Sequence, residues 1–129
     1  MIDFIVTRVH SFRFAIAGWW YVIRTQRNAW IHAVASTLVI LMALWLKLSL
    51  QDCAILILTI GMVWTAEFIN TALEAIVDLA SPQHHPLAKV GKDVGAAAVL
   101  IAALASVLVG LMILGPPLWA HLSVVWELP

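Results

Sequence analysis

The chain has 129 residues, of which 64% are hydrophobic and only 11% are charged, and its formal net charge at pH 7 is +0. Soluble domains are typically about 45–50% apolar and about 25% charged, so this composition excludes an ordinary soluble domain and indicates an integral membrane protein. The balanced charge argues against nucleic acid as a partner, and the single cysteine excludes an intrachain disulfide.

The first segment, residues 2 to about 28, mixes apolar and charged side chains. Isoleucine, valine and phenylalanine residues are interleaved with Asp3, Arg8 and Arg13. This pattern is typical of an amphipathic helix that lies on the membrane surface with its arginines near the headgroups. Gly18 is the candidate for a bend in this helix, and a polar cluster at residues 24–28 precedes the first apolar stretch.

Three apolar stretches follow, and short polar turns separate them. About 20 helical residues cross a bilayer, so each stretch is long enough to be a transmembrane helix. The expected spans cover about residues 29–48, 53–80 and 87–114. The tail, residues 115–129, opens with Gly-Pro-Pro and carries Trp119 and Trp126, so we expect it at the membrane interface. The predicted fold is an all-α integral membrane domain with an N-terminal surface helix and three spans.

Basic residues are unevenly distributed in this three-span topology. Only Lys47 lies at the end that the first two spans share. The other six lie on the opposite side of the membrane: Arg8, Arg13, Arg24, Arg27, Lys89 and Lys92. The positive-inside rule therefore predicts a multi-pass protein with a cytoplasmic N-terminus and an external C-terminus.

The second span carries acidic and polar residues on one helical face. At ~100° per residue, five side chains fall within an arc of about 100°. They are Glu67, Asn70, Thr71, Glu74 and Asp78. A carboxylate in hydrocarbon costs at least a few kcal/mol, so it normally faces a bundle interior and has a function there. The third span begins with a second polar face, which contains Lys89, Lys92 and Asp93.

Carboxylates beside cationic residues suit phosphoryl transfer. That reaction needs a metal on the phosphate oxygens, a cation at the transferring group and a residue that positions the nucleophile. Two other readings stay open: the carboxylates pair with Lys or Arg only to hold the bundle together, or they serve a proton-linked transporter. No glycine-rich phosphate loop is present, so nucleotide binding does not follow from spacing.

Histidines near these faces carry a weaker signal. His84 and His85 are adjacent residues in a loop, and we expect hydrogen bonding there rather than metal binding. His32 is alone in the first span and is expected to be a packed histidine whose hydrogen bonds are satisfied.

The central segment reads Glu67-Phe-Ile-Asn-Thr-Ala-Leu-Glu-Ala-Ile-Val-Asp78. It resembles the signature of the small prokaryotic lipid kinases, the diacylglycerol kinase and undecaprenol kinase family. The similarity covers about residues 10–115 and includes the segments 14–18, 27–32 and 84–98. The His-His-Pro-Leu-Ala-Lys form resembles the undecaprenol kinase branch more than the enterobacterial diacylglycerol kinase branch.

The resemblance implies a homotrimer of three-span protomers in the bacterial inner (cytoplasmic) membrane. Its implied activity is ATP-dependent phosphorylation of a membrane lipid hydroxyl at the cytoplasmic interface. Undecaprenol is the first expected lipid and diacylglycerol the second, and Mg²⁺ is expected to arrive with ATP.

The resemblance also assigns roles to residues of this chain. Glu67 matches the catalytic base that accepts the lipid hydroxyl proton, and Glu74 matches a carboxylate that holds the metal bound to ATP. Lys92 matches the lysine that contacts the transferring phosphate, with Asp93 and His85 in the nucleotide site. Other polar residues around this centre are Asn70, Asp78 and Lys89.

Gln26 is the one departure from the family pattern. The family has a second metal-binding Glu at this position, which also belongs to the nucleotide site. An amide oxygen still coordinates a hard cation but brings no charge, so metal affinity should be lower. A catalytically weak or inactive chain that serves as a structural subunit of a membrane complex is therefore an alternative.

Overall fold

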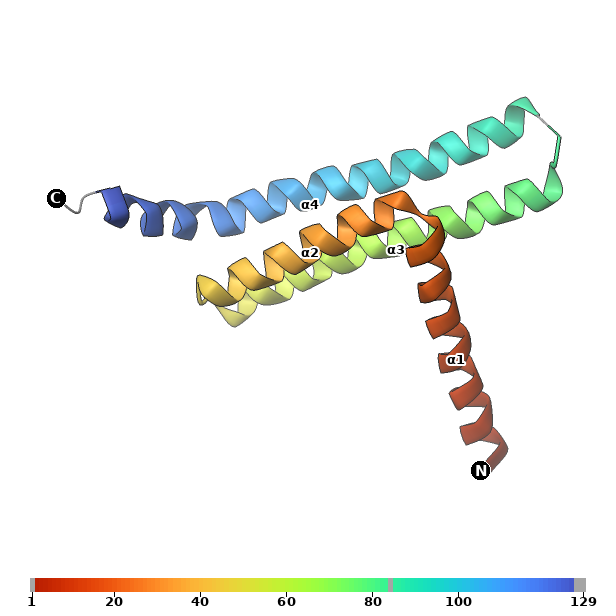
Figure 1. Ribbon diagram of the computed structural model, residues 1–129, viewed down its shortest axis with the longest axis horizontal. Coiled ribbons are helices and arrows are strands. Elements are labelled where there is room, and N and C mark those ends of the chain that lie inside the picture. The colour runs from red at the N-terminus through yellow and green to blue at the C-terminus, as the bar shows by residue number, and fades with distance from the viewer. Residues whose placement is uncertain (1, 84, 127–129) are drawn as a thin grey trace.

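The computed structural model describes residues 2–83 and 85–126, and it describes side chains from residue 11 to 123 apart from residue 84. Over this part of the chain, four α-helices are present and no strand (Figure 1). They are α1 (Ile2–Thr25), α2 (Arg27–Trp45), α3 (Leu50–Ala80) and α4 (Pro86–Trp126). The predicted all-α fold is confirmed. Three segments are long and apolar enough to cross a membrane, which makes this a multi-pass membrane protein: Arg27–Trp45, Leu50–Ala80 and Pro86–Ser123.

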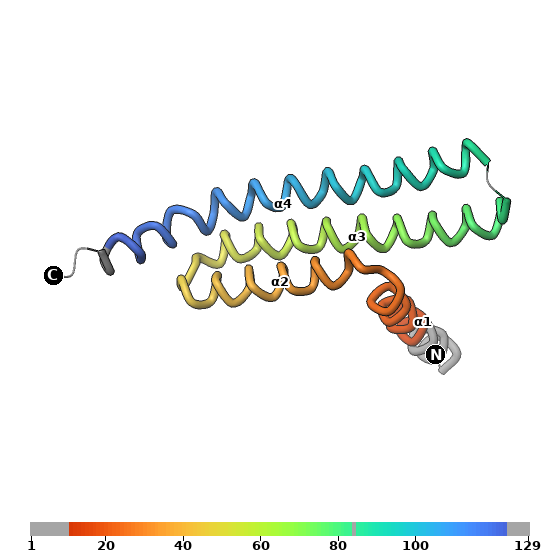
Figure 2. The backbone as a smooth tube through the Cα atoms, turned by 45° about the horizontal axis from the view of Figure 1, so that its top comes forward, coloured from red at the N-terminus to blue at the C-terminus, as the bar shows by residue number. Residues whose placement is uncertain are grey.

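The helices differ greatly in length. Helix α2 has 19 residues, α3 has 31 and α4 has 41. Helices α2 and α3 form an antiparallel hairpin, and α4 runs back along α3 (Figure 1). The α3–α4 pair extends past the start of α2, and α1 leaves the bundle transversely (Figure 2). The end of α3 that carries the acidic face is therefore flanked mainly by α4.

The junction between α1 and α2 lies at Gln26. This residue has extended backbone angles, φ −101° and ψ 118°, between two helical segments. Helix α1 continues through Gly18, so the bend expected there lies at Gln26 instead. Trp19 anchors α1 to α3, because its ring lies 4.8 Å from that of Trp64 and 5.0 Å from that of Phe68.

A tight turn joins α2 to α3. Lys47 adopts the left-handed conformation with φ 52°, and the N–H of Leu48 donates to Ala43 O at 3.1 Å. This is the Schellman pattern that ends a helix. Ser49 then begins α3, because its Oγ accepts from the N–H of Asp52 at 3.1 Å. With these caps, α2 ends at Trp45 and α3 begins at Leu50, whereas the predicted spans ended near residue 48 and began near residue 53.

Helix α4 does not end before Gly115, where the third span was predicted to stop. It continues through Pro116 and Pro117. Proline removes one backbone donor, but transmembrane helices tolerate this loss when neighbouring groups or local geometry compensate. Beyond the prolines, the His121 ring packs 5.4 Å from that of Trp45. The interfacial position of residues 115–129 stays a prediction, and residues 127–129 lie outside the described part of the chain.

A cluster of buried apolar side chains lies near one end of the bundle, and the buried polar side chains follow α3 away from it. The apolar cluster is near the α2–α3 turn and consists of Ala43, Leu46, Leu56 and Leu114. The buried polar side chains lie along α3 toward its other end: Thr59, Glu67, Asn70 and Thr71. The apolar cluster near the α2–α3 turn therefore packs the hairpin against α4, whereas the candidate reactive side chains lie farther along α3.

Candidate active site

Glu67 is the most deeply buried polar side chain, with 1% of its surface exposed. Helix α3 turns it toward α2, where its Oε2 lies 3.6 Å from Nε2 of His32. Among the described residues, neither of these two atoms has a hydrogen-bond partner. The Glu67 carbonyl accepts from Thr71 Oγ1 at 2.8 Å. A buried carboxylate and an imidazole thus face each other across the α2–α3 interface.

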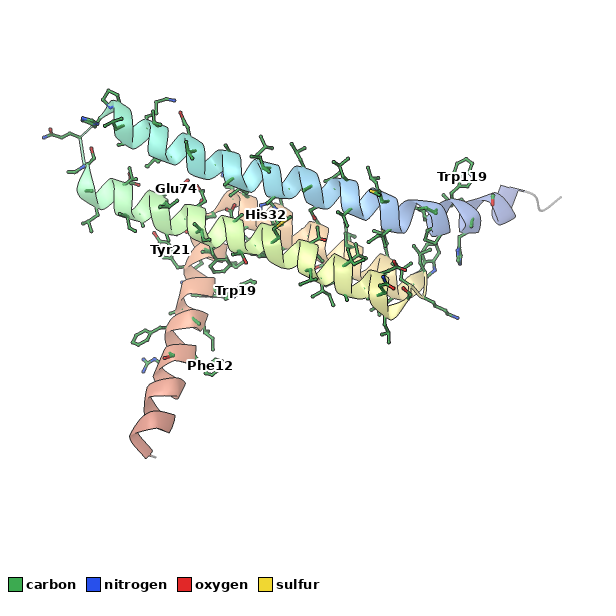
Figure 3. All side chains as sticks on the ribbon, turned by 180° about the vertical axis from the view of Figure 1, so that it is seen from behind. Phe12, Trp19, Tyr21, His32, Glu74 and Trp119 are labelled. Carbon is green, nitrogen blue, oxygen red and sulfur yellow. The ribbon has the colours of Figure 1, made fainter. Side chains whose placement is uncertain are left out.

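About two helical turns later, Glu74 is held by two side-chain amides. Asn70 Nδ2 donates to its Oε1 at 3.0 Å, and Gln26 Nε2 donates to its Oε2 at 3.2 Å. The bend between α1 and α2 is what brings Gln26 to α3. Figure 3 shows Glu74 and His32 near the level at which α1 joins the bundle, far from Trp119. Both carboxylate oxygens are therefore oriented before any ligand binds.

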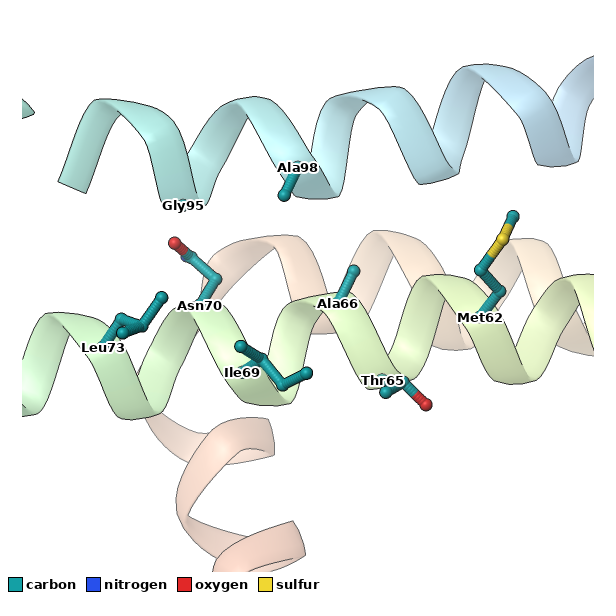
Figure 4. Close-up of a pocket in the computed structure, with 8 residues that line it drawn as sticks. All are labelled: Met62, Thr65, Ala66, Ile69, Asn70, Leu73, Gly95 and Ala98. Carbon is teal, nitrogen blue, oxygen red and sulfur yellow. The ribbon is translucent and has the colours of Figure 1, made fainter. Parts of the chain in front are cut away.

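Asn70 also contacts α4 through a glycine. Its Oδ1 is buried and has no hydrogen-bond partner among the described residues. A Cβ at position 95 would overlap this oxygen, so the close approach requires Gly95. Figure 4 shows Asn70 reaching from α3 toward Gly95 along the edge of an apolar cavity of about 360 Å³.

Two further cavities lie along the α3–α4 groove. Gln26, His32, Asn70 and Glu74 line one of about 270 Å³. The other, of about 320 Å³, is at the projecting end of the two helices. Its charged and histidine lining is Asp78, His85, Lys89, Lys92 and Asp93. The candidate nucleotide-binding and metal-binding residues therefore line one of these two cavities, while Glu67 lies next to His32 at the edge of the first.

Two ion pairs lie in the 320 Å³ cavity at the projecting end of α3 and α4. Lys92 on α4 pairs with Asp78 on α3, and Lys89 pairs with Asp93 one turn along α4. All four side chains are exposed to more than a third, and such pairs contribute only about 0–1 kcal/mol. Lys92 can therefore exchange Asp78 for a phosphate at little cost. His85 accepts from the N–H of Leu87 at 3.2 Å, at the start of α4.

The donor set around Glu74 fits a metal that arrives with phosphate oxygens. The described residues contain no group of three His, Cys, Asp or Glu side chains that could hold a metal alone. Mg²⁺ keeps several waters and is usually bound by one or two carboxylates together with substrate phosphates. At such a site Glu74 would supply one carboxylate, and Gln26 would supply a neutral oxygen after rotation of its amide.

The contact of His32 with Glu67 was not predicted from the sequence. His32 is packed as expected, with 13% of its side chain exposed, but the expectation that its hydrogen bonds are satisfied is wrong for Nε2. The antiparallel hairpin brings this histidine to Glu67, although His32 lies 13 residues before the end of α2 and Glu67 lies 17 residues after the start of α3. The same pairing places Ser36 against Trp64, whose Nε1 donates to Ser36 Oγ at 3.2 Å.

Comparison with known proteins gives one family. Residues 13–114 match the family described as prokaryotic diacylglycerol kinase. A diacylglycerol kinase of Synechocystis sp. is 49% identical over 109 residues, which are 84% of this chain but 62% of that protein. The undecaprenol kinase of Bacillus subtilis is 42% identical over 84% of this chain and 88% of its own. A diacylglycerol kinase of Escherichia coli is 34% identical over 74% of this chain and 80% of its own. This chain thus spans less than two thirds of the Synechocystis protein.

Proposed function

This chain belongs to the prokaryotic diacylglycerol kinase family, and on that premise we propose that it is an ATP-dependent kinase of a membrane lipid alcohol. The observation that supports the proposal most is the line of groups along α3. It runs from buried Glu67 through the amide-held Glu74 to the Lys92–Asp78 pair at the projecting end. This arrangement suits a base at Glu67, a metal-binding carboxylate at Glu74 and a phosphate-binding cation at Lys92, the groups that phosphoryl transfer uses.

Each group has a distinct task in this proposal. Glu67 accepts the proton of the lipid hydroxyl, and Glu74 with Gln26 holds the Mg²⁺ that accompanies ATP. When bound there, Mg²⁺ would supply positive charge to the phosphates of ATP. Lys92 leaves Asp78 and binds the transferring phosphoryl group. Around them, Asn70 fixes Glu74, while His85, Lys89 and Asp93 surround the nucleotide.

In the proposed reaction, one bond to phosphorus forms and one breaks. The lipid oxygen bonds to the γ-phosphorus of ATP, and the bond from that phosphorus to the β–γ bridging oxygen breaks. The hydroxyl proton passes to Glu67, and ADP leaves with the electron pair of the broken bond. General base catalysis of this kind is typically worth about 10²–10⁴ in rate.

The proposal places the site at the cytoplasmic face of a bacterial inner membrane. Arg24, Arg27, Lys89 and Lys92 lie at the end of the bundle that carries the two polar cavities, and Lys47 lies at the other. This asymmetry supports a cytoplasmic N-terminus. We include a homotrimer in the proposal, because the family resemblance implies one and α1 points away from its own bundle (Figure 2).

Gln26 favours a second candidate function, that of a catalytically weak structural subunit. In the structure its amide N–H donates to Glu74, so the side chain adds no negative charge to the metal site. Such a chain would retain the fold and the trimer while phosphorylating lipid slowly or not at all.

The deciding experiment is a phosphorylation assay on the purified protein. The full chain in detergent micelles receives ATP, Mg²⁺ and either undecaprenol or diacylglycerol, and the phosphorylated lipid is quantified. The wild type should phosphorylate at least one of the two lipids, and Glu67→Gln should slow the reaction about 10²–10⁴-fold while sparing assembly. The names of the relatives divide between these lipids, so both are required in the assay.

Asp52→Asn is the matched control, since it makes the same acid-to-amide change at the opposite end of α3. It should retain activity. Absence of phosphorylation with both lipids would refute the kinase proposal and favour the structural subunit. Wild-type turnover in Glu67→Gln would remove Glu67 from the mechanism.

A further inference from the structure

His32 faces the carboxylate of Glu67 from another helix and can donate a hydrogen bond to it. Its Nε2 lies 3.6 Å from Glu67 Oε2, and both side chains are largely removed from solvent. Glu74 already receives two amide donors, whereas Oε2 of Glu67 receives none from the described residues. A buried charged oxygen without a donor carries a desolvation cost that one hydrogen bond would largely remove.

The separation is small enough for a modest rotation to close. Hydrogen bonds from nitrogen to oxygen are about 2.7–3.2 Å long, so the two atoms need to approach by roughly half an ångström. Rotation of the Glu67 carboxylate or of the imidazole achieves this without moving either helix. The neutral tautomer with its proton on Nε2 is the one that can donate to Glu67.

The surroundings restrict the imidazole ring. The ring of Trp64 meets it edge-on, with centroids 6.2 Å apart, and Trp64 is in turn fixed by its hydrogen bond to Ser36. The same imidazole also lines the 270 Å³ cavity that contains Glu74. His32 is therefore held at the boundary between the buried base and the cavity proposed for the metal and nucleotide.

We propose that His32 is a positioning residue for Glu67. This inference rests on the proposed lipid kinase function. The Nε2–H of His32 donates to one carboxylate oxygen of Glu67 and fixes the plane of the carboxylate. The second oxygen is then directed at the hydroxyl of the lipid, and it alone takes the proton. His32 acts through Glu67 and does not need to touch either substrate.

A kinetic experiment tests this role. His32→Phe preserves a flat ring but removes the donor, whereas His32→Gln keeps an N–H donor near the position of Nε2. For His32→Phe, kcat should fall about 10- to 100-fold, as expected for misplaced reacting groups, while KM for ATP and for the lipid stays unchanged. His32→Gln should recover most of the lost kcat.

Thr37→Val is the matched control on the same helix, since its hydroxyl only donates to Ala33 O at 2.8 Å. It should leave kcat unchanged. In a Glu67→Gln background, His32→Phe should have no further effect, because both changes remove the same unit. A full additional loss in that background, or an effect on KM alone, would overturn the proposal.

A second measurement does not depend on activity. The ¹⁵N imidazole signals of His32, assigned by their absence in His32→Gln, should shift in Glu67→Gln relative to the wild type. Unchanged signals would overturn the contact between the two side chains. If the wild type phosphorylates no lipid, the kinase proposal fails, and the NMR comparison still decides whether His32 binds Glu67.

Discussion

Gln26→Glu is the substitution whose effect should reverse sign with magnesium. Gln26 Nε2 lies 3.2 Å from Glu74 Oε2, so the change removes a donor and places a second carboxylate against the first. Two unit charges 3.2 Å apart repel by about 5 kcal/mol at an effective dielectric near 20. Side-chain rotation and proton uptake relieve much of this, so we expect a net loss of about 1–2 kcal/mol in stability without metal.

With Mg²⁺ and nucleotide present, the same pair of carboxylates becomes favourable. A divalent cation between them gains a second charged ligand, and each such attraction is several kcal/mol before desolvation at a dielectric near 20. After desolvation, we expect magnesium to bind about tenfold more tightly, which corresponds to about 1.4 kcal/mol.

Thermal unfolding in micelles measures both effects. Relative to the wild type, Gln26→Glu should unfold at a lower temperature in EDTA, and it should gain more stability from Mg²⁺ with a non-hydrolysable ATP analogue. The Mg²⁺ concentration for half-maximal phosphorylation should fall as well. Gln51→Glu, at the exposed start of α3, is the matched control and should show neither effect. Identical unfolding temperatures for Gln26→Glu and wild type in both buffers would refute the reasoning.

Three further substitutions test separate parts of the structure. Lys92→Met keeps the apolar stem but removes the cation, so turnover should fall and KM for ATP should rise. Unchanged turnover with an unchanged KM for ATP would mean that the Lys92–Asp78 pair is structural. Gly95→Ala should cost about 1–3 kcal/mol in thermal stability because the new methyl group meets Asn70, whereas Gly91→Ala, with only an ordinary contact, should be tolerated. Lys47→Val should be less stable than Lys47→Gly by at least about 1 kcal/mol, because a β-branched residue is strained at φ 52°; equal melting temperatures would contradict this.

The number and type of helices could be predicted because apolar length is a strong signal. Their limits could not, and the reasons are local. Helix α2 ends at a left-handed residue that is Lys47 rather than glycine, so the sequence contained no marker for the cap. Helix α4 passes through Pro116 and Pro117, which end most helices in water but not those that lie in a membrane.

The acidic face of α3 could also be predicted, since its side chains belong to a single helix with a fixed period. The Gln26–Glu74 hydrogen bond and the His32–Glu67 contact join different helices, and these depend on the register of the hairpin and on the bend before α2. Register follows from the length of the turn, which was predicted a few residues too late. Helical periodicity alone therefore identified the carboxylates and Asn70, but not the side chains on other helices that orient them.

The shortness of α2 sets the depth at which the reaction occurs. At ~1.5 Å per residue its 19 residues measure about 28 Å, close to the thickness of the hydrocarbon layer, whereas α4 is about twice as long. His32 then sits only about 8 Å beneath the start of α2, and Glu74 lies nearer the water. In the proposed reaction, the acceptor hydroxyl can therefore stay among the headgroups, and ATP does not need to enter the hydrocarbon. A thicker bilayer would cover the carboxylates before it covered the ends of α4, so turnover should depend on acyl-chain length.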